Sequence, residues 1–155
     1  MSNPRRRTFT GDRAEQTEFQ HEVLEVARVV RVVKGGRRFR FRAAVIVGDR
    51  GGRVGLGIAK SRDVQQAITK AQAQAMKNVV RVSLAEGTIA HQTLTRFKGA
   101  QIMLKPARPG TGIIAGGTVR AVADMVGITD IVSKQFGSSH KVNNALATIK
   151  ALQSL

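Results

Sequence analysis

Hydrophobic and polar positions alternate along much of the first half of the chain, as they do in β-strands. Residues 23–33 are rich in valine, residues 37–47 run from alternating Arg and Phe into an Ala/Val stretch, and residues 53–59 alternate Val, Leu and Ile with glycine. Glycine-containing sequences at 34–36 and 48–52 separate these stretches and are typical of turns. We therefore predict three strands joined as an antiparallel meander.

A helix is predicted to follow over residues 62–80. Apolar side chains recur there at helical spacing and form one stripe, made by Val64, Ala67, Ile68, Ala71, Ala75 and Val79. Ser61 is a suitable N-cap, and Asp63 suits a helix start because its charge complements the helix dipole. The stripe is expected to cover one face of the sheet, which completes a β-β-β-α domain over residues 18–84.

The second half of the chain mixes strand and helix patterns. The expected elements are strands at 88–97 and 100–106, a helical apolar series within 113–126 that ends at Gly127, a short strand within 128–136 and a helix at 141–152. Together the halves indicate an α+β protein with a second domain over residues 88–155. Residues 1–17 are polar, include Arg5-Arg6-Arg7 and lack apolar periodicity, so we expect a mobile basic arm there.

Composition adds a strong charge imbalance. The 155 residues hold 26 Lys and Arg against 10 Asp and Glu, for a formal net charge of +16. Ten of the cations and a single acid, Asp49, fall within residues 28–60. On a strand, Arg38, Arg40 and Arg42 would share one face. The opposite face would then carry Phe39, Phe41, Ala43, Val45 and Val47. Because guanidinium groups suit phosphate oxygens, we predict that this cationic row binds a polyanion.

Nucleic acid matches this charge better than a membrane does. No apolar run approaches the roughly 18 residues of a membrane-spanning helix, and the cations lie on a strand pattern rather than on a long amphipathic helix. The chain has no Trp or Tyr and only 6 Phe, few for a protein that stacks single-stranded bases on aromatic rings. We therefore expect contacts to the phosphates, sugars and shape of folded RNA.

The candidate RNA-binding residues are the cations of this region and the glycines of its first turn, since glycine allows close backbone approach. They are Arg28, Arg31, Lys34, Gly35, Gly36, Arg37, Arg38, Arg40, Arg42, Arg53 and Lys60. The second turn, at residues 48–51, spells the GXXG of a KH loop. Strand patterns flank it, so we interpret it as a hairpin turn.

Catalytic and cofactor motifs are weak. Residues 110–117 place glycines ahead of a helix, where free amides could hold a phosphate, but the P-loop and dinucleotide spacings are missing. We interpret these glycines as packing and turning residues, with a nucleotide-binding enzyme as the alternative. His21, His91 and His140 lack acidic or thiol companions at ligand spacing, and the chain has no Cys. We predict no enzyme activity, no cofactor, no metal and no small-molecule substrate.

Four short segments occur in an order that closely resembles one protein family. They are VVKGGR at 32–37, VGD at 47–49, GRVG at 52–55, and GTGIIAGG at 110–117 followed by Arg120-Ala121-Val122. On these segments the sequence resembles the bacterial-type family of the fifth protein of the small ribosomal subunit. The resemblance runs over residues 18–152.

The resemblance implies both a fold and a function. The fold would be an N-terminal domain similar to a double-stranded-RNA-binding domain, then an α/β domain with a four-stranded sheet, two helices and a left-handed β-α-β crossover, a rare handedness. The function would be that of a structural protein that binds small-subunit rRNA where the head meets the body. Its neighbours would be the fourth and eighth small-subunit proteins, and with the fourth it would influence decoding accuracy.

Residue roles also follow by position from the resemblance. Residues 30–37 match the family's head-facing loop, close to which spectinomycin binds, and Gly112 and Arg120 match positions that face the fourth protein. The chain departs from the family at Ala27 and Val30, where Asn and Ser are usual. The implied location is a cytoplasmic ribosome, with an organellar ribosome as the alternative. A free-standing double-stranded-RNA-binding processing factor is the rival function.

Overall fold

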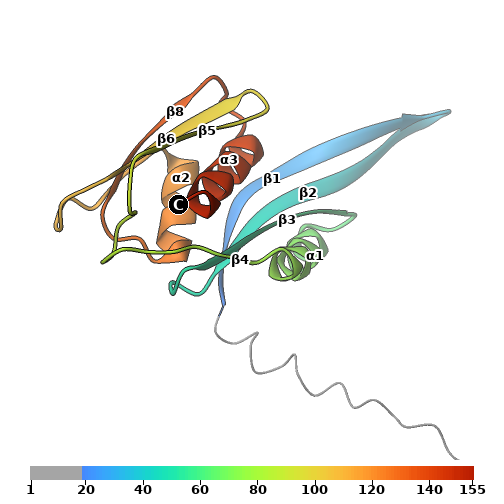
Figure 1. Ribbon diagram of the computed structural model, residues 1–155. Helices are drawn as coiled ribbons and strands as arrows, with labels where there is room; N and C mark the ends of the chain where they lie inside the picture. The colour runs from blue at the N-terminus through green and yellow to red at the C-terminus, as the bar shows by residue number, and fades with distance from the viewer. Residues whose placement is uncertain (1–18) are drawn as a thin grey trace, which may run out of the picture.

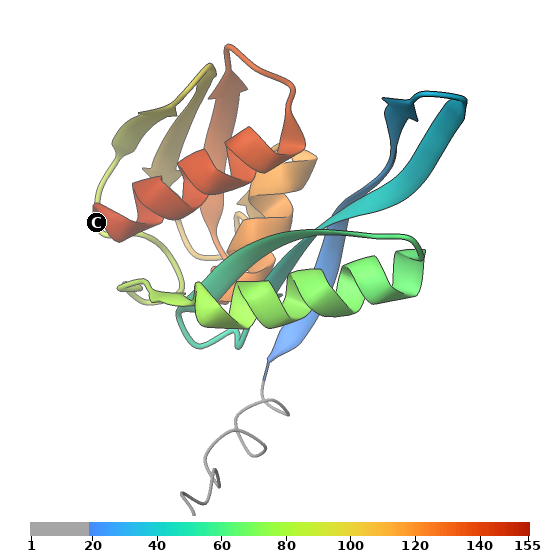
Figure 2. The same ribbon diagram turned by 90° about the vertical axis from the view of Figure 1, so that its right-hand side faces the viewer.

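The structure is a computed structural model that describes residues 19–155 (Figures 1 and 2). The predicted basic arm at 1–17 lies outside the described residues. The elements, in chain order, are β1 (Gln20–Val33), β2 (Gly36–Gly48), β3 (Arg53–Ser61), α1 (Val64–Lys77), β4 (Val80–Arg81), β5 (Thr93–Phe97), β6 (Ala100–Pro106), β7 (Ile113–Ile114), α2 (Gly117–Val126), β8 (Ile131–Phe136) and α3 (Lys141–Gln153). The predicted α+β class is confirmed.

The first sheet is the predicted antiparallel meander with one short strand added, in the order β1-β2-β3-β4. Strand β2 alternates its side chains between the two faces. Ala43, Val45 and Val47 point to α1 and pack on its Ala67, Ala71 and Ala75, in a core without any exposed side-chain surface. The small alanines let α1 lie close to the sheet, and Gly55 and Gly57 on β3 increase that closeness.

The second sheet has the order β5-β6-β8-β7. Strands β5, β6 and β8 are antiparallel neighbours, and β7 is parallel to β8. The connection from β7 to β8 runs through α2, so the β-α-β crossover is present. The left-handedness that the resemblance implies stays a prediction. Helix α2 ends where expected, at Gly127, whose φ of 93° is the left-handed conformation typical of a helix stop.

A second, larger core joins the two halves of the chain. Ala44, Ile46, Val54 and Leu56 on the far face of the first sheet pack with α2, α3 and the inward side chains of β6. The layers are therefore α1, first sheet, α2 with α3, and second sheet (Figure 2). The first sheet and α2 pack closely, because a Cβ added to Gly48 of β2 would lie 2.1 Å from the carbonyl oxygen of Met125 in α2.

Some local predictions were wrong. The N-cap of α1 is Asp63 rather than Ser61, whose hydroxyl donates instead to Gln66 at 2.9 Å. The helix ends at Lys77, because residues 80–81 pair with β3 as a strand. Of the strand expected at 88–97, only β5 forms, and the start of the helical series expected at 113–126 is the two-residue strand β7.

Candidate nucleic-acid interface

Strands β1 and β2 extend beyond the rest of their sheet as a two-stranded projection, formed mostly by residues 26–42, which we call the β1–β2 arm (Figures 1 and 2). Strand β3 ends at Ser61, which pairs with Phe41, so residues 36–40 of β2 pair only with β1. The tip turn contains Gly35, whose φ of 91° favours glycine, and a Cβ added at Gly35 or Gly36 would meet no atom within 4 Å. The arm therefore ends in an open, narrow turn.

One face of the arm is cationic. Arg31 pairs with Arg38, Val29 pairs with Arg40, and Arg42 pairs with Lys60 of β3. Directly paired residues of antiparallel strands share a face, so the predicted row of Arg38, Arg40 and Arg42 is present and is widened by Arg31 and Lys60. A hollow of about 380 Å³ lies on this part of the arm and is lined by Val29, Val30, Arg31, Val33, Arg38, Arg40 and Lys60.

The members of the cationic row are not equivalent. Arg42 Nη2 lies 3.5 Å from Glu25 Oε2, and both side chains are about 30% exposed, at 29% and 30%. Arg31, Arg38 and Arg40 are exposed, and among residues 19–155 none of them forms an ion pair. Arg42 is therefore partly neutralised within the protein, while the outer cations keep their charge for a partner. The sequence alone did not indicate Glu25 as a partner of Arg42.

The opposite face of the arm is mixed. Arg28 and Arg37 pair with Phe41 and Val32, so they point away from the cationic row, on the side of Phe39. The guanidinium carbon of Arg28 lies 3.8 Å from the centre of the Phe39 ring, a cation–π contact. Phe39 points away from the row as predicted, but the ring is 43% exposed rather than part of the core.

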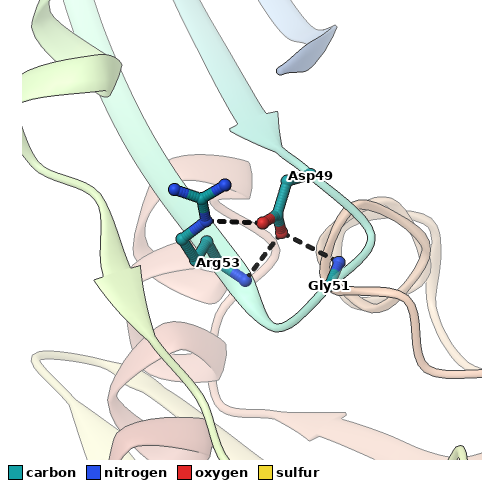
Figure 3. Close-up of polar contacts among 3 residues, drawn as sticks. All are labelled: Asp49, Gly51 and Arg53. Carbon is teal, nitrogen blue, oxygen red and sulfur yellow. Dashed lines mark hydrogen bonds and ion pairs between the residues drawn. The ribbon is translucent and has the colours of Figure 1, made fainter. Parts of the chain in front are cut away.

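Arg53 occupies a different setting at the base of the sheet, as the first residue of β3 after the turn from β2 (Figure 3). Asp49 Oδ1 accepts from the backbone N–H groups of Gly51 and Arg53, both at 2.9 Å, and Asp49 Oδ2 accepts from Arg53 Nε at 2.5 Å. Burial alone would raise the pKa of Asp49, but the side-chain hydrogen bond from Arg53 and these backbone bonds outweigh it and hold the pKa below 3.8. Residues 48–51 are a hairpin turn, as interpreted, and Arg53 stabilises it.

The carboxylate of Asp130 binds the loop at residues 110–112. Asp130 Oδ1 accepts from the backbone N–H of Gly112 at 2.8 Å, and Asp130 Oδ2 accepts from the Thr129 hydroxyl at 2.8 Å. The Gly112 amide, the Thr129 hydroxyl and the amides of Gly110 and Thr111 hold the pKa of Asp130 below 3.8, because all of them stabilise the carboxylate. An internal carboxylate therefore occupies the Gly112 amide, which a phosphate bound at this loop would need.

Gly112 and Arg120 belong to the segment that forms β7 and α2. Gly112 is at φ +77° directly before β7, and Arg120 is exposed in the first part of α2. Arg120 lines a hollow of about 450 Å³ together with Glu22, Ile113, Gly117, Ala121, Asp124 and Thr129. The assignment of these residues to a protein interface stays a prediction.

The histidines do not form a site. His140 is the N-cap of α3, where its Nδ1 accepts from the backbone N–H of Asn143 at 3.3 Å. Across residues 19–155, no group of three His, Asp or Glu side chains is placed to hold a metal ion. None of the helices described in that range is long and apolar enough to cross a membrane.

Comparison with known proteins identifies the family. Residues 19–83 match the family described as ribosomal protein S5, N-terminal domain, and residues 95–155 match ribosomal protein S5, C-terminal domain. The small ribosomal subunit protein uS5 of Thermotoga neapolitana is 49% identical over 138 residues, which are 89% of this chain and 78% of that protein. The chain belongs to the ribosomal protein S5 family. The resemblance inferred from the four segments is thus confirmed.

A relative from a second organism gives the same result. The small ribosomal subunit protein uS5 of Treponema pallidum is 46% identical over 151 residues, which are 97% of this chain and 88% of that protein. The S5 family is one of ribosomal proteins and not an enzyme family. Membership in it supports a structural role in the small ribosomal subunit.

Proposed function

We propose that the protein binds folded small-subunit rRNA through the cationic face of the β1–β2 arm. The observation that carries this proposal is the shared orientation of Arg31, Arg38 and Arg40 on a segment that extends beyond the rest of its sheet. Residues 26–42, which form most of the arm, contain no Asp or Glu. A surface of this kind attracts phosphates strongly and repels other cationic surfaces.

The geometry favours positioning rather than sequence reading. Guanidinium groups on one face can each bind phosphate oxygens through two N–H donors, which fixes the register of the protein on the RNA. The turn at Gly35 and Gly36 can approach an RNA backbone closely, because these two residues have no side chain to keep the RNA away and Lys34 directly before them adds a positive charge. Lys60 would add a phosphate contact next to the row, and Arg37 would add one on the opposite face of the arm. Arg28 supports the Phe39 ring.

The position within the subunit and the decoding role are also part of the proposal. We place the protein at the junction of head and body, on cytoplasmic ribosomes, with the fourth and eighth small-subunit proteins as neighbours. Gly112 and Arg120 would face the fourth protein, and their interface would influence decoding accuracy. Residues 30–36 would lie near the spectinomycin site. These assignments rest on the family resemblance and on the exposure of Arg120 and the arm tip.

Co-sedimentation tests the proposal. The full chain, expressed in cells with a small affinity tag, should be found with small ribosomal subunits at one copy per subunit and should stay there through a low-salt wash. A processing factor would instead be found at far less than one copy and mainly on immature particles. That second distribution would contradict the structural role.

The nucleotide-binding alternative is disfavoured by Asp130. Its carboxylate accepts from the Gly112 amide and is stabilised by the amides of Gly110 and Thr111, so a phosphate there would meet a fixed negative charge. Ligand binding to the folded state must raise the melting temperature. We expect ATP and GTP at millimolar concentration to leave it unchanged, and a reproducible rise would revive the enzyme alternative.

A further inference from the structure

The second sheet has one face that no described element covers. Helices α2 and α3 lie on its other side, against the first sheet (Figures 1 and 2). Strand β6 points Ala100, Ile102 and Leu104 toward those helices, all fully buried, so Met103 and Lys105 point away from them. We call the six exposed side chains on the uncovered side the open sheet face: Leu94, Arg96, Lys105, Ile114, Lys134 and Phe136.

Strand register brings these residues into adjacent rows across the sheet. Arg96 and Phe136 both pair with Gln101 of β6, one from each side. In the next row Leu94 and Lys134 both pair with Met103. Lys105 follows Met103 by two residues on β6 and belongs to the third row, where it pairs with Val132. Neighbouring strands are roughly 5 Å apart, so cationic and apolar groups lie side by side over the whole face.

The open sheet face is positive without any acidic residue. None of the outward positions of β5, β6, β7 and β8 is Asp or Glu. Arg96 Nε donates to the backbone oxygen of Lys98 at 3.2 Å, which leaves its terminal nitrogens available. Among residues 19–155, neither Lys105 nor Lys134 takes part in an ion pair. A partner that neutralises this face must therefore supply several negative charges.

The exposed apolar groups narrow the choice of partner. Leu94, Ile114 and Phe136 are 57%, 55% and 42% exposed, so a partner would also cover apolar surface. RNA supplies phosphates at a short, regular spacing together with the carbon faces of ribose and base, and an exposed aromatic ring can stack on a base. A protein partner would have to place a separate carboxylate beside each of the three cations of this face. The net charge of the chain, +16, attracts a polyanion such as RNA directly.

We propose that the open sheet face is a second RNA-binding surface, separate from the arm. Arg96, Lys105 and Lys134 would bind phosphates, and Phe136 would pack on a ribose or an unpaired base. Helices α2 and α3 lie between the second sheet and the first sheet, so the open sheet face is not continuous with the cationic row, although both surfaces are turned away from α1 (Figure 1). The protein would therefore hold RNA at two separate surfaces.

The lack of Cys makes a direct test possible. Lys134→Cys would carry an aryl azide photo-crosslinker, and the labelled full chain would be assembled into small subunits from rRNA and purified proteins. Irradiation should crosslink position 134 to rRNA. Gln74→Cys, at an exposed position on α1, controls for labelling and for nonspecific crosslinking. Crosslinks from position 134 to a ribosomal protein alone, or none at all, would overturn the proposal.

A binding measurement separates this inference from the proposed function. Replacing Arg96, Lys105 and Lys134 together with Gln should lower the slope of log K against log salt by about 2 to 3 for binding to small-subunit rRNA. Circular dichroism should show an unchanged fold, because all three side chains point away from the core. If the arm substitutions lower the slope and these do not, the arm function stands and the second surface is refuted.

Discussion

Gly57 on β3 tests the close packing of α1 on the first sheet. A Cβ added to Gly57 would lie 2.0 Å from the carbonyl oxygen of Ala71 and 2.5 Å from the backbone nitrogen of Ala75. Both atoms are helix backbone, so no side-chain rotation can relieve the overlap. In Gly57→Ala the helix must move away from the sheet by more than 1 Å to restore an ordinary contact of 3.4 Å.

The cost of this movement can be estimated from the core that it disturbs. Ala67, Ala71 and Ala75 have no exposed surface and pack directly on β2, so moving α1 loosens the whole of the smaller core. Overpacking of this kind costs about 1–3 kcal/mol. For a chain of this size each kcal/mol lowers the melting temperature by about 2–4 °C. Gly57→Ala should therefore melt about 2–12 °C below the parent protein.

Thermal and urea unfolding followed by circular dichroism measure the effect. The matched control is Gly117→Ala in α2, where an added Cβ meets no atom within 4 Å. That variant should be as stable as the parent or more stable by up to about 1 kcal/mol, since alanine restricts the unfolded chain. A Gly57→Ala protein with parental stability would show that α1 does not pack on β3 at this distance.

Two further predictions concern the carboxylates. Asp49→Asn should lower the free energy of unfolding by about 1–3 kcal/mol at pH 7, because it removes a charged partner of Arg53. The folded-state pKa of Asp49 lies below 3.8, so the parent should keep this advantage above about pH 4 and lose it progressively as the pH falls through the folded-state pKa, and the urea midpoints of parent and variant should approach each other over that fall. Asp130→Ala should speed hydrogen exchange at the Gly112 amide without affecting α3, and unchanged exchange would show that Asp130 does not hold the loop.

Sequence patterns predicted the long elements because their periodicity is local. The alternation in residues 37–47 correctly placed Arg38, Arg40 and Arg42 opposite Val45, and the helical stripe correctly placed α1 on the sheet. Strands β4 and β7 have two residues each, too few to show any period, and they form only because a neighbouring strand offers hydrogen bonds. Such elements depend on tertiary structure.

The candidate site was only partly predictable for the same reason. Side chains alternate between the two faces of a strand, and this alternation places Arg28 and Arg37 on the face opposite the cationic row. The pairing of Glu25 with Arg42 depends on the register of two strands, including an irregularity between Val23 and Glu25. No local pattern specifies that register. The carboxylate of Asp130 likewise reaches Gly112 across 18 positions of sequence.

The salt dependence of rRNA binding tests the central claim most directly. The triple variant Arg31→Gln, Arg38→Gln and Arg40→Gln should bind small-subunit rRNA with a log–log salt slope smaller by about 2 to 3. Arg42→Gln alone should change the slope less than Arg38→Gln alone, because Glu25 already neutralises part of the Arg42 charge. A triple variant with the parental slope would contradict the account, since the arm would then make no phosphate contacts.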